Sequence, residues 1–301
     1  MAEPCCCCFA PGYYDARSVG AEGAQAAASG QGKAKRVGMA RRNFRHKVVV
    51  ITGATGGIGT ALCQRFGQAR ARVVLLDLDP ELLSSLQLQL ERNGSKALGL
   101  RCDITDEAAC QAAMLAAQQH FGGIDVLINN AGIAHRSRFE ETSAEVFRRV
   151  MEVNFFGALN CTRAALPSLL ERRGMIITLS SRAGVSPQWG QSGYSASKYA
   201  LHGLFESLRR EYCPRELKVM MVCPGFTATD LNKNALQGDG SRISHSFSLA
   251  GSVASPADVA DDIYRGAVRE KDLLMLSNVS PWGRLVATLA PRFYARAVAR
   301  A

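Results

Sequence analysis

The stretch Lys47-Val48-Val49-Val50-Ile51-Thr52-Gly53-Ala54-Thr55-Gly56-Gly57-Ile58-Gly59 decides the fold of this 301-residue chain. Its first six residues are mostly β-branched and apolar, which is typical of a short strand buried in a parallel sheet. Four glycines follow, and residues 60–66 then have the spacing of a helix. A strand, a glycine turn and a helix in this order predict a dinucleotide site, where the backbone approaches a pyrophosphate at the helix N-terminus.

An acid ends the next apolar run, Arg72-Val73-Val74-Leu75-Leu76-Asp77. A carboxylate at this place accepts hydrogen bonds from the two hydroxyls of an adenosine ribose and repels a 2′-phosphate. The glycine turn contains no basic residue that would attract that phosphate. We therefore predict NAD as the cofactor, with NADP as the alternative because Arg72 and other basic residues are near.

Strand patterns alternate with helical ones along the chain. The apolar run 97–101 precedes a helical pattern over 107–121, and the run 218–222 follows another helical stretch. This alternation predicts right-handed βαβ units. We expect the α/β class over residues 46–276, as a single Rossmann-type doubly wound parallel sheet with helices on both faces. No apolar run is long enough to span a membrane.

Tyr194 and Lys198 are four residues apart, so on a helix their side chains share one face. An ammonium beside a phenol stabilises the phenolate and lowers its pKa toward neutral pH. The spacing alone fits either an acid/base pair or an ordinary pair of surface side chains. The overlapping Ser195-Ala196-Ser197-Lys198 also spells a Ser-x-x-Lys nucleophile motif, but the companion motifs Ser-Asp-Asn and Lys-Thr-Gly are absent from the sequence.

The chain resembles the short-chain dehydrogenase/reductase family, in its Tyr-x-x-x-Lys branch, from about residue 46 to 270. The resemblance rests on six ordered motifs at the family spacing. They are Thr52-Gly53-x-x-x-Gly57-x-Gly59, Cys102-Asp103-Ile104-Thr105, Asn129-Asn130-Ala131-Gly132, Asn154 in Val153-Asn154-Phe155-Phe156-Gly157, Ser181 with Tyr194 and Lys198, and Pro224-Gly225-Phe226-Thr227-Ala228-Thr229.

The resemblance implies a role for each matching residue. Tyr194 would be the acid/base, Ser181 would hydrogen-bond the reacting oxygen, Lys198 would lower the tyrosine pKa and bind the nicotinamide ribose, and Asn154 would hold a water. Substrate contacts are expected at Ser181, Gln188 and Gln191. Cofactor contacts are expected at Gly53, Thr55, Gly57, Ile58, Gly59, Asp77, Asp103, Ile104, Asn130, Ala131, Gly132, Tyr194, Lys198, Pro224, Gly225, Thr227 and Thr229.

These residues predict an NAD(P)-dependent oxidoreductase that acts on a secondary alcohol or its ketone. Residues 199–208 and the C-terminal extension are similar to those of hydroxysteroid-dehydrogenase-like and sphingoid-ketone-reductase-like members, which suggests a bulky lipophilic substrate; the alternative is a small acyl-carrier-bound ketone. The alternative is a catalytically silent dinucleotide-binding sensor or scaffold of the same fold. A nucleic-acid partner rests only on the net charge of +10, without a recognition motif. No metal site is expected, and the family implies a homodimer or homotetramer through helices around 143–171 and 192–213.

The two ends of the chain differ from the middle. Residues 1–45 lack apolar periodicity and have the composition of a disordered or linker-like extension, and Met39 is the start that we favour for the native protein. Residues 277–301 suggest a basic helical extension, in which Arg292, Arg296 and Arg300 share one face. Peripheral contact of this helix with an anionic membrane and a packed extension with a solvated edge are both open.

Two further groups bear on the environment of the site. Gln188, Trp189 and Gln191 precede Tyr194 and are expected to line the substrate pocket. His135 is either a substrate contact or a solvated loop residue. The cysteines scattered from Cys63 to Cys223 fit buried thiols in a reducing compartment, so we expect a cytoplasmic protein.

Overall fold

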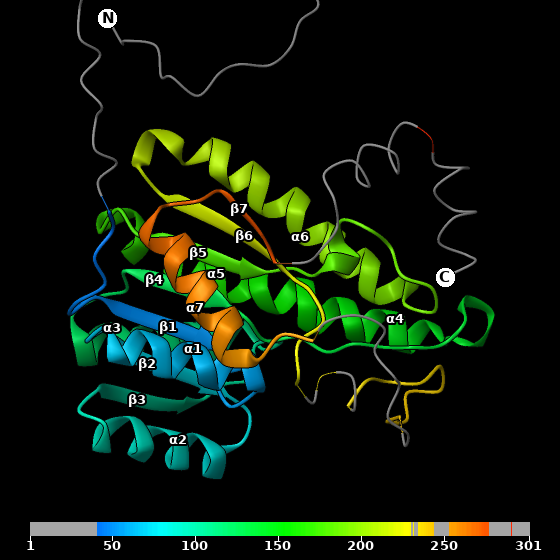
Figure 1. The fold of residues 1–301 in the computed structure, drawn as a ribbon, viewed down its shortest axis with the longest axis horizontal. Helices are drawn as coiled ribbons and strands as arrows, with labels where there is room; N and C mark the ends of the chain where they lie inside the picture. The colour runs from blue at the N-terminus through cyan, green and yellow to red at the C-terminus, as the bar shows by residue number, and fades with distance from the viewer. Residues whose placement is uncertain (1–40, 230, 232–233, 244–252, 277–289, 291–301) are drawn as a thin grey trace, which may run out of the picture. The chain divides into compact units, whose positions relative to one another are not determined.

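A parallel sheet with helices on both faces forms the body of the protein (Figure 1). The computed structural model describes residues 41–229, 231, 234–243, 253–276 and 290. Within these residues, seven strands run parallel in the order β3-β2-β1-β4-β5-β6-β7. The predicted doubly wound parallel sheet is therefore confirmed.

Strand bounds follow the apolar runs of the sequence closely. The strands are β1 Val48–Thr52, β2 Arg72–Asp77, β3 Lys96–Arg101, β4 Val126–Asn129, β5 Met175–Leu179, β6 Lys218–Pro224 and β7 Leu273–Leu276. The helices are α1 Gly57–Gln68, α2 Pro80–Arg92, α3 Glu107–Phe121, α4 Ala144–Met151, α5 Gly157–Glu171, α6 Ser192–Glu211 and α7 Pro256–Val268. Short 3₁₀ turns lie at Phe139–Glu141, Arg182–Gly184 and Cys213–Arg215, and a π-helical segment lies at Glu152–Phe156.

Alternating side chains of each strand supply two separate cores. In β1, Val49 and Ile51 pack with residues of α1, α2 and α7 on one face of the sheet. Val48 and Val50 point to the other face, where they pack with α3, α5 and α6. Because both faces are covered by helices, every residue of β1 is buried, which explains its continuous apolar run.

The order of the strands reverses at the centre of the sheet, and this reversal places the site. From β1 the chain winds outward through β2 to β3, then returns so that β4 pairs with the other side of β1. The loops that follow β1 and β4 therefore diverge at the carboxyl ends of the strands. A ligand crevice is expected at this switch point.

Three features differ from the sequence prediction. The edge strand β7 and helix α7 were not predicted, and Phe44, within the expected extension, is buried against Phe66 and Tyr264. The helix expected over 143–171 is interrupted by the π-helical segment. The remaining predictions for residues 1–40, including Met39 as the start, and for the C-terminal helix of 277–301 lie outside the described residues.

Among the residues that the structure describes, no helix combines the length and the apolar character that crossing a bilayer requires.

Candidate active site

One cavity of about 590 Å³ at the carboxyl ends of the strands brings the predicted residues together. It is lined by every residue predicted to contact the cofactor, and by Ser181, Gln188 and Gln191 among those predicted to contact the substrate. Among the predicted catalytic residues, Ser181, Tyr194 and Lys198 line it, whereas Asn154 lies behind its wall. We call this cavity the cleft. Its volume is in the range of natural small-molecule sites.

The glycine turn after β1 brings backbone to the surface of the cleft. Gly53 has a φ of +62°, and a Cβ there would lie 2.8 Å from Ala131 Cα. A Cβ at Gly59 would lie only 2.0 Å from Gly53 O. Helix α1 begins at Gly57 with Gly56 as its N-cap, and no side chain caps it. Its first N–H groups and the positive end of its dipole are thus available to an anion in the cleft.

Two carboxylates lie beside this turn. Asp77 Oδ2 accepts hydrogen bonds from Thr55 N at 2.9 Å and Thr55 Oγ1 at 2.6 Å, and Oδ1 accepts one from Leu78 N at 2.8 Å. Asp103 Oδ1 accepts from Thr105 N at 2.9 Å and Thr105 Oγ1 at 2.8 Å. The hydrogen bond from the Thr105 backbone holds the pKa of Asp103 below its usual value. Both carboxylates are therefore held in fixed orientations at this end of the cleft.

Asn130 fixes the wall between β1 and β4. Its Nδ2 donates to Thr52 O and Gly53 O, each at 2.9 Å, and its backbone N donates to Thr52 Oγ1 at 3.0 Å. A Cβ added at Gly132 would lie 3.0 Å from Asn154 Oδ1 and 3.3 Å from Lys198 Nζ. The Asn-Asn-Ala-Gly segment therefore joins the glycine turn to the acid/base residues through hydrogen bonds and close contact.

Asn154 is buried in the π-helical segment Glu152–Phe156. Its Oδ1 accepts from Ile133 N at 2.8 Å, and its Nδ2 donates to Ile133 O at 2.9 Å and to Ser197 Oγ at 2.9 Å. Short π-helical insertions are frequent at functional sites. Here the π-helical segment places the side-chain amide of Asn154 between Ile133, at the wall of the cleft, and Ser197 of helix α6.

Helix α6 presents Tyr194 and Lys198 on its buried face, as their spacing predicts. The side chain of Ser181, which follows β5, is close enough to Tyr194 to act on the pKa of its phenol. The Lys198 Nζ atom donates to Leu179 O at 3.0 Å and lies 5.7 Å from the centre of the Tyr194 ring. Strand β5 and the residues that follow it thus contact both side chains that α6 supplies.

The pKa of Tyr194 departs from the prediction made from the Tyr-Lys spacing. Burial raises the pKa of Tyr194, and the hydrogen bond with Ser181 acts in the lowering direction. The net shift is upward because removal of the phenolate from water outweighs that hydrogen bond. Lowering the tyrosine pKa therefore requires positive charge beyond what the protein supplies at this position.

Lys198 is expected to make the stability of the fold depend on pH above about 8. Burial lowers its pKa from 10.5 to about 8, with Cys223 acting in the opposite direction. Between these two values the unfolded chain binds the proton and the folded chain does not, so this contribution to stability rises with pH. Relative to Lys198→Met, the wild type should gain about 3 kcal/mol across that window.

Urea unfolding of both proteins at a series of pH values across this window measures the difference. Titrations of the buried cysteines other than Cys223 are common to the two proteins and cancel in the difference. A free-energy difference that stays constant with pH would show that Lys198 keeps its ordinary pKa in the folded protein.

The loop after β6 forms the far wall of the cleft. Pro224, Gly225, Thr227 and Thr229 all line it. The loop is tied to residue 254 because Ala254 N donates to Phe226 O and Ala228 N donates to Ala254 O. A Cβ at Gly57 would lie 2.7 Å from Thr229 Cγ2, so this wall touches the glycine turn.

The segment before Tyr194 matches the prediction in part. Gln188 and Gln191 line the cleft, but Trp189 does not, and its side chain is 73% exposed. The expectation that Trp189 lines the pocket was wrong because the turn at Gly190 (φ +68°) carries it outward. Sequence reasoning also missed Arg149, Arg182, Leu231 and Asn234, which line the cleft as well.

His135 is neither solvated nor in the cleft. Its side chain is fully buried, and Nε2 accepts a hydrogen bond from Gly193 N at 2.8 Å, next to Tyr194. Burial lowers the pKa of His135, which favours the neutral ring that this hydrogen bond needs. Both interpretations made from the sequence were wrong, because a contact across 58 residues leaves no local pattern.

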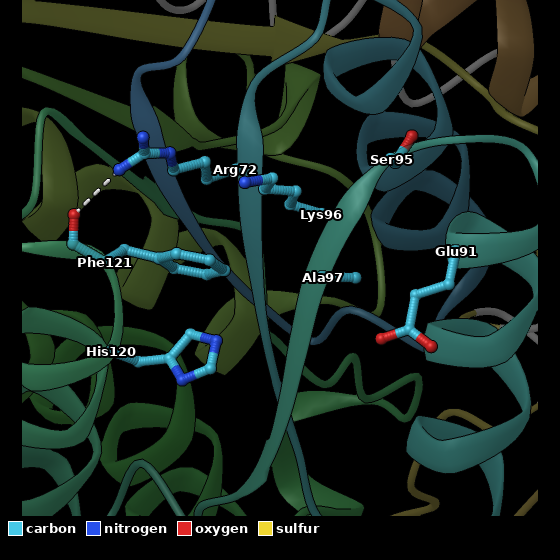
Figure 2. Close-up of a pocket in the computed structure, with 7 residues that line it drawn as sticks. All are labelled: Arg72, Glu91, Ser95, Lys96, Ala97, His120 and Phe121. Atoms are coloured by element: carbon cyan, nitrogen blue, oxygen red, sulfur yellow. Dashed lines mark hydrogen bonds between the residues drawn. The ribbon is translucent and has the colours of Figure 1, made fainter.

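A second cavity, of about 490 Å³, lies at the opposite, amino ends of β2 and β3 (Figure 2). Arg72 and Lys96 are neighbours in register there, and Arg72 NH1 donates to Phe121 O at 3.1 Å. None of the predicted site residues lines this cavity. Arg72 therefore places a positive charge at the C-terminus of α3, where the negative end of the helix dipole favours a cation.

Comparison with known proteins connects this geometry to a family. A model described as short chain dehydrogenase matches residues 47–240. The mouse protein Dehydrogenase/reductase SDR family member 7B is 36% identical over 262 residues, which cover 85% of this chain and 81% of that protein. The 2,5-dichloro-2,5-cyclohexadiene-1,4-diol dehydrogenase LinX of Sphingobium indicum is 33% identical over 216 residues, which cover 71% of this chain and 86% of that protein.

Solved structures share the fold. A dehydrogenase/reductase from Sinorhizobium meliloti 1021 matches with a TM-score of 0.69 at 33% identity, covering 79% of this chain and 96% of that one. A short chain dehydrogenase/reductase from Burkholderia phymatum, determined in complex with NAD, matches with a TM-score of 0.75. It is 24% identical and covers 84% of this chain and 96% of that one, a likeness of fold alone.

Proposed function

Because the chain belongs to the short-chain dehydrogenase/reductase family, we propose that it is an NAD-dependent oxidoreductase that interconverts a secondary alcohol and its ketone. The observation that carries this proposal is that Ser181, Tyr194 and buried Lys198 line the same cleft as the glycine turn. An acid/base residue beside a dinucleotide site is what this reaction needs. A catalytically silent sensor would not require an acid/base residue beside its dinucleotide site.

The residues of the cleft fit a dinucleotide. Gly53, Gly57 and Gly59 leave no room for a Cβ, so the turn is built for close backbone approach. The uncapped N-terminus of α1 would receive the pyrophosphate, and Asp77 would accept hydrogen bonds from the adenosine ribose. Asp103 would lie beside one end of the bound dinucleotide, and the loop after β6 would lie beside the other end. A bound nicotinamide would accept or supply the hydride.

Four side chains would handle the proton and the substrate oxygen. Tyr194 Oη would donate the proton when a ketone is reduced and accept it when an alcohol is oxidised. Ser181 Oγ would hydrogen-bond the same oxygen and stabilise charge that develops on it. The Lys198 ammonium would favour the tyrosinate electrostatically. Asn154 would position a water that returns the proton to the site.

Preference for NAD rests on the charge of Asp77. We expect NADH to bind roughly ten- to a hundredfold more tightly than NADPH, because the 2′-phosphate would lie against this carboxylate. Asp77→Asn keeps an oxygen for Thr55 but removes the charge, so the difference between the cofactors should shrink. Fluorescence titration with each reduced cofactor measures both constants.

A matched control for this titration is Asp106→Asn. Asp106 caps α3 outside the cleft, and asparagine caps a helix equally well. Equal binding of NADH and NADPH to the wild type would overturn the role of Asp77 while leaving the family intact. Absence of binding of either would contradict both the oxidoreductase and a sensor of these cofactors, and would leave the scaffold.

The substrate that we propose is largely lipophilic. Ile133, Ala134, Phe226 and Leu231 line the cleft and supply apolar surface.

We further propose a homodimer or homotetramer, supported by exposed Phe156 and by Tyr199 on α6. A cytoplasmic location is supported by the thiols: Cys110 and Cys161 remain free although their sulfurs are only 3.6 Å apart. Peripheral membrane contact of the C-terminal segment is proposed from its charge alone.

A further inference from the structure

Arg182 places a positive charge in the part of the cleft nearest the reacting groups. It follows Ser181 directly and opens the short 3₁₀ turn Arg182–Gly184. Its side chain is partly buried and lines the cleft together with Ser181 and Tyr194. A cation held so close to the acid/base residue affects which substrates the site can accept.

Two contacts hold the guanidinium in place. Arg182 NH2 donates to Gln188 Oε1 at 2.6 Å, and its Cζ lies 4.5 Å from the centre of the Phe226 ring. The Gln188 amide is itself oriented, because its Nε2 donates to Ser186 O at 2.9 Å. Stacking on an aromatic ring and a hydrogen bond in the plane of the fork together preorganise an arginine. Gln188 therefore positions Arg182, in addition to lining the cleft.

No carboxylate among the described residues pairs with this charge. Arg182 takes part in none of the ion pairs formed within that part of the chain. The two acids that line the cleft, Asp77 and Asp103, are hydrogen-bonded beside the glycine turn and at the end of β3. An arginine offers five N–H donors, and in the described residues one of those of Arg182 has a protein acceptor.

We propose that Arg182 binds the carboxylate of the substrate, so that the enzyme acts on hydroxy acids and the corresponding keto acids. This inference rests on the proposed oxidoreductase function. A carboxylate fits the planar fork in a bidentate manner. Among the described residues that line the cleft, the other cations are Lys198, assigned to acid/base chemistry, and Arg149, whose charge acts on Asp103. The single cation next to Ser181 matches a monoanion better than a doubly charged phosphate.

The reaction balances without a further reactant. In oxidation, the C–H bond of the carbinol would break and its electron pair would pass as hydride to bound NAD, while the O–H proton would pass to the Tyr194 phenolate and from there to water. The products are a ketone, NADH and a proton. The carboxylate on Arg182 is unchanged and serves to orient the carbinol toward Ser181 and Tyr194.

Binding tests the inference separately from turnover. The enzyme–NADH complex is titrated by calorimetry with a series of aliphatic hydroxy acids and with the methyl ester of each acid. No turnover occurs during the titration, because the hydroxy compound and NADH are both in their reduced forms. The wild type should bind at least one acid of the series roughly ten- to a hundredfold more tightly than its ester. Arg182→Met should abolish this preference without weakening NADH. Arg148→Met is the control, because Arg148 pairs with Glu145 on the exposed face of α4.

Turnover of the same series separates the two proposals. Gln188→Met, which removes the acceptor that orients Arg182, should raise KM for the preferred acid and leave kcat nearly unchanged. Equal binding of acids and esters by the wild type would overturn the role of Arg182 whether or not the enzyme turns over. Weaker NADH binding in Arg182→Met would assign this cation to the cofactor instead. Preferential binding of an acid without any oxidation of it by NAD would contradict the oxidoreductase function and leave the anion site standing.

Discussion

Replacing Tyr194 by phenylalanine should lower kcat about 10²- to 10⁴-fold, the range associated with loss of a general acid/base. The change removes one oxygen and keeps the ring that packs in the buried cluster with Val146 and Val150. The unfolding free energy and the Kd for NADH should therefore stay close to the wild-type values. Initial rates of NAD reduction with the best secondary alcohol for the wild type, together with NADH titration, measure both effects.

Tyr264→Phe provides the matched control for loss of a tyrosine hydroxyl. Its ring lies on α7 among Phe44 and Phe66, away from the cleft, so its kcat should equal that of the wild type. Full activity of Tyr194→Phe would refute the acid/base assignment. A loss of activity accompanied by an equal loss of NADH binding would instead indicate that the hydroxyl supports the cofactor site.

Gly59→Ala should weaken NADH binding at least about tenfold and destabilise the fold by about 1–3 kcal/mol. The added methyl group would lie 2.0 Å from Gly53 O and 3.0 Å from Ala54 C. Both are backbone atoms of the glycine turn, which cannot rotate away as a side chain can. The turn must therefore move, and the helix N-terminus moves with it. Urea unfolding and NADH titration report the two consequences.

Gly203→Ala is the control for this substitution, because Gly203 also lies in a helix but a methyl group added there would meet no heavy atom within 4 Å. Alanine is the better helix former, so this variant should gain up to about 1 kcal/mol. If Gly59→Ala gained stability in the same way and bound NADH normally, the close packing of the turn would not be needed for cofactor binding.

Much of the fold could be predicted because its signals are local. Residues 107–121 form α3 and residues 72–77 form β2 with the predicted bounds, since buried strands and capped helices have distinct patterns. The edge strand β7 escaped prediction because it is only four residues long, Leu273–Leu276, and three of them are only partly buried. Its place in the sheet depends on pairing with β6, about fifty residues earlier in the chain.

The same limit applies to the site. The residues that form motifs, such as Gly59 and Tyr194, could be identified because their types and their spacing along the chain are visible in the sequence. His135 and Arg182 could not, because their roles depend on partners in other segments, Gly193 and Phe226. Gln188 was predicted as a substrate contact, and its amide is occupied by Arg182 and Ser186. Hydrogen bonds between loops leave no periodic trace in a sequence.

The π-helical segment fixes the number of residues that can lie between α4 and α5, whichever side chains they carry. Each residue of a helix turns its successors by about 100°, and the π turn holds one residue more than an α turn does. Deleting one residue from Glu152–Phe156 would rotate the core face of α5 relative to that of α4, and Asn154 would leave its partners. From Ala144 to Glu171, the number of residues is therefore constrained separately from the identity of the side chains.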